Sequence, residues 1–319
     1  MRRVLVSHVD SRLARRLIKA LYHDPEVVLV LGLGTGPAPG YLKPYRDKCV
    51  YQRLDLARPR HVLNLFRSER FLRTRPNSVV HLPPLLDARR VPGKLPVAVA
   101  ETRCLIEECK QRPEIERFVH LSSGFVYRAE PGNANVVSEE QVLDFDAASE
   151  IRAFVDADLT CQAELKNPEF RVTILRPATI VTEAGEVLQS PPLEVPEAPL
   201  GFDPMLSVVS ERDVASALLL ALHADCPGIY NIAGREVFPR SALARSLRAV
   251  ARPTLPRLLS SAVSLARQTL DLLRGSESGC RRYGLALDTR RARESLGFEP
   301  QYRIELHGPD GRIETVAVR

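Results

Sequence analysis

Two histidines stand at the ends of predicted strands. His8 follows the apolar run Val4–Val6, and His81 lies in the run Val79–Leu82. The carboxyl ends of neighbouring parallel strands meet at the crevice where ligands bind, so the two imidazoles are predicted to lie side by side. Together they would form a proton relay or half of a metal site. The alternative is that each is an ordinary turn or strand-end residue without chemistry.

A second motif with chemical potential is the glycine run Gly32-Leu-Gly-Thr-Gly36, which directly follows the predicted strand Val27–Leu31. A dinucleotide fingerprint needs a helix after the glycines, because the helix N-terminus binds the phosphates. Pro37, Pro39 and Gly40 follow instead and break the chain. The run is therefore interpreted as a loop.

Strands alternate with helices along the chain. The predicted strands are Val4–Val6, Val27–Leu31, Val50–Gln52, Val79–Leu82, Phe118–Leu121, Arg171–Leu175 and Gly228–Ile232. The predicted helices are one through Leu13, Leu17 and Leu21 that is capped by Asp10-Ser11, then Val97–Cys109, Ser149–Lys166 and Glu211–His223. This alternation predicts an α/β fold with a doubly wound, Rossmann-like parallel sheet.

The domain organisation follows from the same pattern. Residues 1–183 are predicted to form the Rossmann-like domain, to which residues 206–234 return. Residues 184–205 and 235–319 are predicted to form a smaller lobe, with helices and a terminal β-hairpin around the turn Pro309-Asp-Gly311.

Composition excludes several classes of protein. The chain has 319 residues, of which 45% are hydrophobic and 26% charged, so disordered and coiled-coil proteins are excluded. It contains no apolar run of 18 residues, hence no predicted transmembrane segment. Its six cysteines form no Cys-x-x-Cys or Cys/His cluster, which indicates reduced thiols, no metal site of this type and a cytoplasmic location. The net charge of +6 is concentrated in residues 235–319, which carry +7.

Four stretches carry a family resemblance. They are Arg117-Phe-Val-His-Leu-Ser-Ser-Gly-Phe-Val-Tyr127, Val172-Thr-Ile-Leu-Arg-Pro-Ala-Thr-Ile-Val181, Gly228-Ile-Tyr-Asn-Ile-Ala-Gly234 and Leu287–Pro300. In this order the chain resembles the extended short-chain dehydrogenase/reductase family, the NAD-dependent epimerase/dehydratase group. The stretch Gly201–Val214 is most similar to an atypical branch of that family. The resemblance implies a Rossmann-like fold with a nicotinamide cofactor at the crevice.

The cofactor motif implied by the resemblance is degenerate here. The family's three loop glycines align with His8, Ser11 and Ala14, and Asp10 places a carboxylate where the pyrophosphate would lie. The acidic residue expected after the second strand is Gly34. Four residues keep family positions that contact the cofactor weakly, and they are Ser11, Asp55, Leu56 and His81. We therefore expect no cofactor, or NAD(P) bound with weak affinity.

The catalytic motif is also incomplete. The family uses a serine, a tyrosine and a lysine, of which Ser123 matches the serine. The tyrosine position falls on Ala148 or Ser149, and the lysine position on Arg152. Arginine stays charged at all relevant pH values and no phenol stands four residues before it, so the proton relay is missing.

Three functional hypotheses follow. The first is a non-catalytic binding or regulatory protein whose partner is an unknown small molecule or protein. The second is an NAD(P)-dependent oxidoreductase or epimerase with a rearranged site. The third is nucleic-acid binding through the basic residues 235–319, although no aromatic side chains accompany the arginines. Residues Leu255–Leu273 would form either a membrane-surface helix or a core helix. The resemblance further implies a homodimer through Pro96–Gln111 and Ser149–Lys166.

Overall fold

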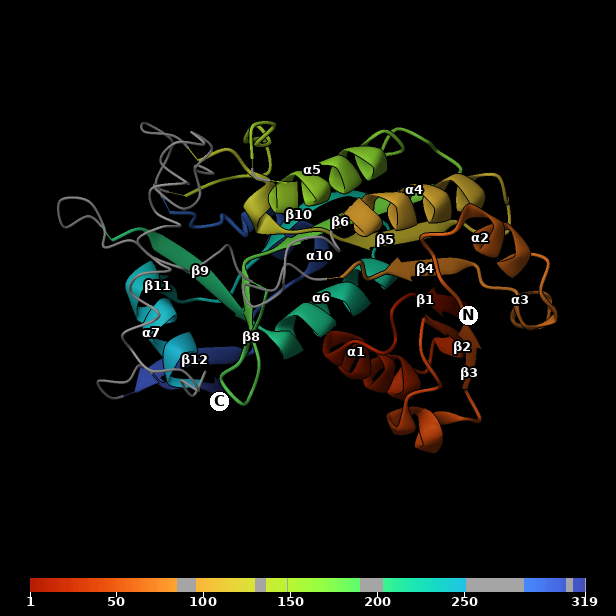
Figure 1. The fold of residues 1–319 in the computed structure, drawn as a ribbon, viewed down its shortest axis with the longest axis horizontal. Coiled ribbons are helices and arrows are strands. Elements are labelled where there is room, and N and C mark those ends of the chain that lie inside the picture. The colour runs from red at the N-terminus through yellow and green to blue at the C-terminus, as the bar shows by residue number, and fades with distance from the viewer. Residues whose placement is uncertain are drawn as a thin grey trace, which may run out of the picture.

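The central feature of the fold is a seven-stranded parallel sheet (Figure 1). The computed structural model describes residues 1–84, 96–129, 136–147, 149–189, 203–250, 284–307 and 312–318. The sheet contains β1 (Arg2–Val6), β2 (Val27–Gly34), β3 (Cys49–Arg53), β4 (Ser78–His81), β5 (Arg117–Leu121), β6 (Arg171–Pro177) and β10 (Gly228–Ile232). Their order is β10-β6-β5-β4-β1-β2-β3, which confirms the predicted doubly wound α/β fold.

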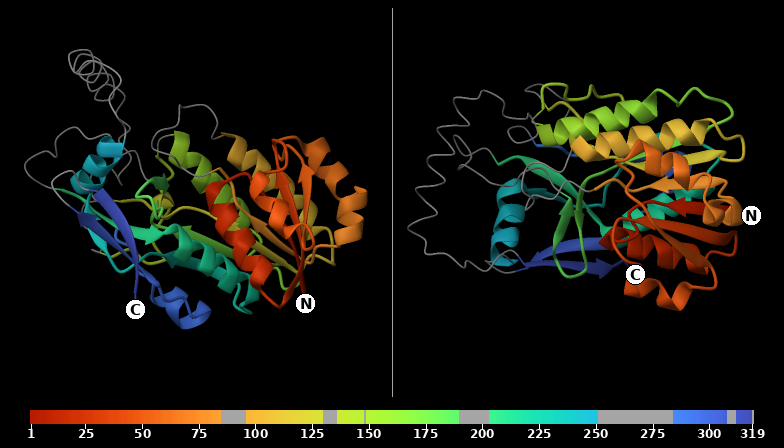
Figure 2. Two further views of the ribbon diagram at one scale, coloured as in Figure 1. Left: turned by 90° about the horizontal axis from the view of Figure 1, so that it is seen from below. Right: turned by 45° about the vertical axis from the view of Figure 1, so that its right-hand side comes forward.

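Helices cover both faces of this sheet (Figure 2). On one face α1 (Arg12–His23) packs beside α6 (Glu211–His223). On the other lie α4 (Pro96–Lys110) and α5 (Ser149–Gln162), which pack on each other, with α2 (Pro59–Leu65) and α3 (Glu69–Thr74). Leu13, Leu17 and Leu21 are fully buried beneath α1, as their spacing predicts.

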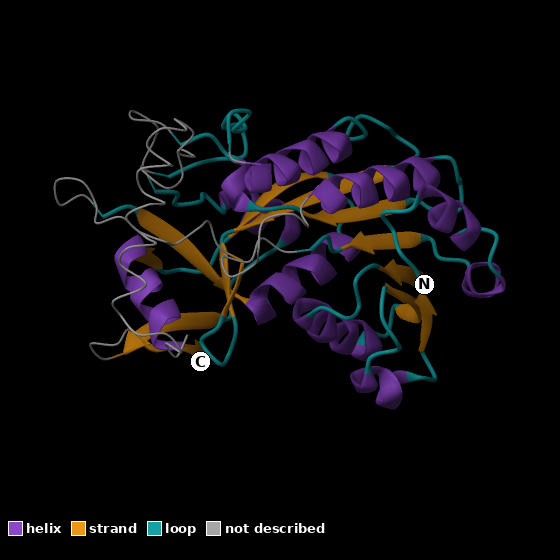
Figure 3. Cartoon of the chain, viewed as in Figure 1, coloured by secondary structure: helices purple, strands orange, loops and turns teal. Residues whose placement is uncertain are grey.

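A second, smaller lobe continues from the carboxyl end of β6 (Figure 3). Its four-stranded sheet has the order β11-β9-β7-β8. The strands are β7 (Thr179–Val181), β8 (Val187–Gln189), β9 (Met205–Ser210) and β11 (Val237–Pro239). The lobe also holds α7 (Arg240–Val250) and the antiparallel hairpin of β12 (Tyr302–His307) and β13 (Arg312–Ala317), while α10 (Arg290–Leu296) packs against β10 and α6. The predicted terminal hairpin is confirmed.

Two expectations from the sequence need correction. Within residues 206–234 only α6 and β10 return to the main sheet, because β9 pairs with β7 and β11 in the smaller sheet. Gly32 and Gly34 belong to β2 and not to a loop. Gly32 is needed there because a Cβ at this position would lie 3.0 Å from Cγ1 of Val9. As expected, no α-helix follows directly; a 3₁₀ helix, η1, spans Gly40–Tyr45.

Some expectations concern residues outside the described ranges. These are the helix Leu255–Leu273, the turn Pro309–Gly311 and the side chain of Ala148. Among the helices that the structure does describe, we find none with the length and apolar character needed to cross a bilayer.

A fully buried ion pair links β6 to α5. Arg176 donates from Nη2 to Oδ1 of Asp158 (2.6 Å) and from Nε to Oδ2 (2.9 Å), and their side chains are at most 1% exposed. Ser122 and Gln162 also donate to the Asp158 carboxylate. Burial alone would raise the pKa of Asp158, but the Arg176 guanidinium and these hydrogen bonds outweigh it and lower that pKa below its usual value.

We expect the substitution Asp158→Asn to lower the free energy of unfolding by about 3–5 kcal/mol, because it leaves a guanidinium buried without its carboxylate. Since the folded-state pKa is lowered, the pair stabilises the fold above the unfolded carboxyl pKa of about 3.9 and loses this effect as the pH falls through the folded-state value. Urea unfolding at pH 7 measures the loss. The control Asp156→Asn removes the half-exposed partner of Arg152 and should cost under about 1 kcal/mol. Equal losses of unfolding free energy in the two variants would contradict a special stabilising role of the buried ion pair.

Candidate functional site

The candidate site lies at the carboxyl ends of β1 and β4, where the strand order reverses. His8 follows β1 with a φ of 48°, the left-handed conformation that glycine adopts most readily. Its Nε2 lies 3.3 Å from Oε2 of Glu101, a carboxylate of α4 with a 3% exposed side chain. His8 Nδ1 is buried and makes no hydrogen bond within the described ranges. This arrangement gives the crevice an imidazole backed by a buried carboxylate, the pattern of a general base.

His81 lies beside His8, as predicted, with ring centroids 6.5 Å apart. It has no exposed surface, and its Nδ1 and Nε2 lie 2.9 Å from Ser7 Oγ and 3.0 Å from Thr102 Oγ1. Burial, followed by the neighbouring His120 and His8, lowers the pKa of His81 well below its ordinary value. A fully buried, neutral imidazole engaged on both nitrogens does not reach a ligand, so His81 acts here as a packing residue.

His120 of β5 completes this row of imidazoles. Its ring stacks on His81 with centroids 5.5 Å apart and an interplanar angle of 25°. Both ring nitrogens are buried without a hydrogen-bond partner in the described part of the chain. Burial lowers the pKa of His120 to about 4. Across those same ranges no group of three or more histidine, cysteine or acidic side chains is arranged to hold a metal ion.

The N-cap of α1 differs from the expected pair Asp10-Ser11. Ser11 alone is the N-cap of α1, and its Oγ accepts a hydrogen bond from the amide of Ala14 (3.2 Å). Asp10 is exposed and does not cap the helix; its Cγ lies 3.6 Å from the position of a Cβ on Gly34. The Asp10 carboxylate therefore lies at the end of β2, beside the position where the resemblance places a ribose-binding acid.

A small hollow opens at the ends of β1, β2 and β3. It is lined by His8, Leu33, Gly34, Thr35, Leu54 and Leu56, and its empty volume is about 160 Å³. Sites for drug-sized ligands and cofactors are about 300–1,000 Å³, so this hollow is too small for such a ligand in this conformation. Of the four predicted cofactor contacts, Leu56 is the one that lines it directly.

Asp55 keeps its position after β3, but its carboxylate is already engaged. It accepts from the amide of Ala57 (3.1 Å) and pairs with the Arg58 guanidinium (3.1 Å). The side chain is 38% exposed, so it remains at the rim of the hollow.

Ser123, the predicted catalytic serine, is fully buried. Its Oγ caps the short 3₁₀ helix η2 (Gly124–Val126) by accepting from the amide of Phe125 (3.2 Å). It also accepts from Nε2 of Gln189 in β8 (3.0 Å). The first contact is a local cap and the second links the main sheet to the smaller lobe, so the hydroxyl is not presented to a substrate in this conformation.

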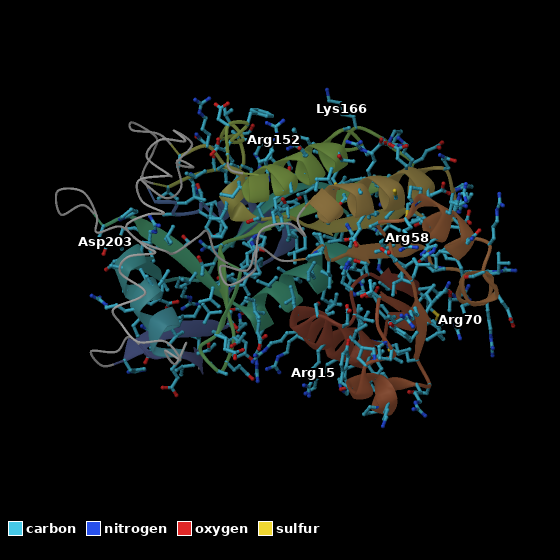
Figure 4. The ribbon with its side chains drawn as sticks, in the orientation of Figure 1. Arg15, Arg58, Arg70, Arg152, Lys166 and Asp203 are labelled. Carbon is cyan, nitrogen blue, oxygen red and sulfur yellow. The ribbon has the colours of Figure 1, made fainter. Side chains whose placement is uncertain are left out.

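Arg152, which aligns with the family's lysine, has partners of its own. It pairs with Asp156 one turn along α5 (2.8 Å) and donates to the carbonyl oxygen of Phe145. Figure 4 places its side chain at the N-terminal part of α5. Tyr127 does not supply the missing phenol, because it is fully buried, donates to Asn231 Oδ1 (2.6 Å), and has its pKa raised by burial to about 12. Ser123 and Arg152 thus bond to different groups and form no relay.

The residues present do not fit a pyrophosphate. Close approach of phosphates to the β1–α1 loop needs glycine at the first loop position, and His8 fills it with an imidazole held against Glu101. Asp10 adds a negative charge beside this loop, and the Ser11 hydroxyl already occupies the Ala14 amide. Residues 8–11 of the loop include no lysine or arginine that would neutralise phosphate charge.

Three buried side chains of this region are not predicted from the sequence, and they are Glu101, Asp158 and Gln189. The burial of Glu101 could have been predicted, because it precedes Leu105 by four residues and so shares the buried face of a predicted helix. Asp158 sits between apolar positions of α5 in the same way. The burial of Gln189 could not have been predicted, because its three-residue strand is too short to show alternation of apolar and polar residues.

In sequence, the chain is similar to mycobacterial proteins. No protein-family model matches the chain. Three curated mycobacterial relatives match, among them "Uncharacterized protein Rv0501" of Mycobacterium tuberculosis and "Uncharacterized protein Mb0513" of Mycobacterium bovis. Each is 26% identical over 209 residues, which are 62% of this chain and 54% of the relative. The match therefore spans about half the length of these relatives.

Solved structures match over nearly the whole chain. The dTDP-glucose 4,6-dehydratase of Bacillus anthracis in complex with NAD is 16% identical, with a TM-score of 0.65 and coverage of 94% of this chain and 91% of that one. The UDP-glucose 4-epimerase of Thermotoga maritima with UDP-glucose is 15% identical, with a TM-score of 0.67 and coverage of 94% of each chain. At such identities the likeness establishes the fold, which is that of the NAD-dependent epimerases and dehydratases.

The buried His120 should make the fold sensitive to acid. Its folded-state pKa of about 4 lies below the unfolded value of about 6.5, so the unfolded chain binds the proton first and stability falls as the pH drops through this window. A single such group costs up to about 1.4 kcal/mol per pH unit. We expect His120→Phe to lose less free energy of unfolding than the wild type between pH 6.5 and 4.5, in urea titrations normalised to pH 8. Parallel pH dependences of the two proteins would contradict this role.

Proposed function

We propose that this chain is a degenerate member of the extended short-chain dehydrogenase/reductase family that works as a non-catalytic binding or regulatory protein. It uses the crevice at the ends of β1, β2 and β4 to hold a small ligand or a segment of a protein partner. We propose no nicotinamide chemistry for it, because the loop, the serine and the arginine described above are each committed to other contacts. The cytoplasm is the compartment that we propose.

The observation that carries this proposal is the conformation of His8. A left-handed backbone at this position is what a glycine loop would supply, and the chain retains that backbone while filling the space with an imidazole. The imidazole lies 3.3 Å from the Glu101 carboxylate, which is buried on the far side of the crevice. A pyrophosphate would have to displace this contact and leave a buried carboxylate unpaired, which is costly.

The alternative is an NAD(P)-dependent oxidoreductase or epimerase with a rearranged site, and one observation favours it. The Asp10 carboxylate reaches the end of β2 beside Gly34, where the family's acidic residue would bind the ribose hydroxyls. In this alternative Asp10 is a ribose ligand that has moved from β2 to the neighbouring loop. The two proposed functions predict opposite effects of the Asp10 charge on the affinity for NAD(P).

The substitution Asp10→Asn separates the two functions, because it removes the charge and keeps the shape. We expect wild-type protein to bind NAD(H) and NADP(H) no tighter than about 1 mM in calorimetric titration, since loss of the pyrophosphate and ribose contacts costs several kcal/mol. We expect Asp10→Asn to leave the affinity unchanged or increase it. The double variant His8→Gly with Asp10→Gly should bind at least tenfold tighter than wild type, because it reopens the loop.

The opposite pattern would support the oxidoreductase. Micromolar affinity of the wild-type protein, lost in Asp10→Asn, would show that the carboxylate is a ligand and would overturn the proposal. The matched control is Asp47→Asn, which alters an exposed carboxylate that contacts Tyr22 and lies outside the crevice. It should bind the dinucleotides as the wild type does.

We also propose a homodimer built on α4 and α5, which pack on each other on one face of the sheet. Paired helices of this kind can meet their two-fold copies in a four-helix interface. Light scattering coupled to size-exclusion chromatography should give twice the mass of 35.5 kDa at micromolar concentration. The double variant Arg103→Glu with Glu107→Arg, on the exposed side of α4, should change the dimer dissociation constant. A monomer mass for the wild type would contradict the proposal.

A further inference from the structure

A strongly basic surface covers the segment from the end of β3 through α3. Residues 53–75 contain seven arginines and two carboxylates, Asp55 and Glu69. All seven arginines are exposed, and we call them the arginine surface; they are Arg53, Arg58, Arg60, Arg67, Arg70, Arg73 and Arg75. Arg58 pairs with Asp55, whereas the other six form no ion pair with any residue that the structure describes. This segment lies outside residues 235–319, where the sequence predicts the basic excess.

The arginine surface is held by a well-packed underside. Val62, Leu65, Phe66 and Phe71 of the α2–α3 segment are buried in the core on the α4 side of the sheet. The Oγ of Ser68 caps α3 by accepting from the amide of Phe71 (3.2 Å). With one face of each helix buried, the polar faces are fixed toward solvent. Figure 4 labels Arg58 near α2 and Arg70 near α3.

Arginines on another short helix behave differently. On α10, Arg290 pairs with Asp288, Arg291 with Glu140, and Arg293 with Glu299. Charge on that helix is therefore neutralised within the protein. On the arginine surface only Arg58 forms an ion pair with a described residue, so most of the positive charge faces solvent and whatever binds there.

The apolar side chains on this surface indicate the kind of partner. Leu63 and Leu72 are 37% and 58% exposed, and Leu72 lies between Arg70 and Arg73. Basic residues interleaved with exposed leucines suit the headgroup boundary of an anionic bilayer, where both charge and apolar area contribute to binding. A single-stranded nucleic acid would need exposed aromatic rings for stacking, and the two phenylalanines of this segment are buried.

We propose that the arginine surface docks the protein on an anionic phospholipid bilayer. The guanidinium groups contact the headgroup phosphates, and Leu63 and Leu72 enter the boundary between headgroups and acyl chains. Binding is peripheral, because the helices that carry the surface have seven and six residues and keep their other face in the protein core.

Sedimentation of the full chain with vesicles tests this proposal. We expect the protein to pellet with vesicles of 70% phosphatidylcholine and 30% phosphatidylglycerol at 100 mM salt, and to remain in the supernatant with phosphatidylcholine alone. Each basic residue near an anionic surface contributes about fivefold to partitioning. The triple variant Arg67→Gln, Arg70→Gln, Arg73→Gln should therefore bind at least tenfold more weakly. The double variant Leu63→Ser, Leu72→Ser should bind the anionic vesicles more weakly than the wild type. Its relative loss should be larger at high salt, where the charges are screened and the apolar contacts contribute a larger share of binding.

The matched control removes the same charge elsewhere, as Arg290→Gln, Arg291→Gln and Arg293→Gln on α10. It should retain wild-type binding, and circular dichroism should show all variants folded. Equal loss in the two triple variants would overturn the proposal, because net charge and not this surface would then decide binding. Absence of pelleting with the anionic vesicles would overturn it too, as would tighter binding to a 20-nucleotide oligonucleotide than to vesicles at the same salt.

Discussion

The buried pair of Arg176 and Asp158 is the constraint on which one half of the molecule depends. It joins β6 to α5, and the guanidinium also lies over the Tyr127 ring, 4.8 Å from its centroid. Tyr127 in turn donates to Asn231 of β10, so the network links β6, β10, α5 and the segment that follows η2. Because the pair is surrounded by hydrogen-bond donors, its desolvation is offset within the core. Ser122 donates to the Asp158 carboxylate, whereas the neighbouring Ser123 caps η2 and accepts from Gln189.

The other half of the crevice contains a row of three imidazoles, of which His81 and His120 are fully buried. His8, His81 and His120 come from three neighbouring strands, with Glu101 facing the first of them. These groups pack against one another beneath the β1–α1 loop. The apolar faces of α1 and α6 stabilise the sheet independently of the loop. The packing of the sheet is therefore compatible with a changed loop, and the likeness in fold does not by itself carry a function.

The sequence predicts the main sheet well, because most of its strands contain apolar runs and α1, α4, α5 and α6 have apolar residues at helical spacing. Short elements escape this reasoning: β7, β8 and β11 have three residues each, and α2 and α3 have seven and six. Within the site, the neighbouring positions of His8 and His81 follow from strand order alone. The capping role of Ser11 in place of Asp10 and the Glu101 contact do not, since they depend on side-chain direction and on packing between distant segments.

The arginine surface and the crevice are continuous along the chain, and this relation links the two proposals. Leu54 and Leu56 line the hollow, while Arg53 and Arg58 flank them within six residues. A bilayer that engages the arginines would therefore lie at the rim of the hollow, beside the Asp55 carboxylate. Ligand binding in the hollow and docking on lipid would then share the same loop after β3. Coupling between them requires only that each orders this loop, because a segment already ordered by one partner costs less entropy to bind the other.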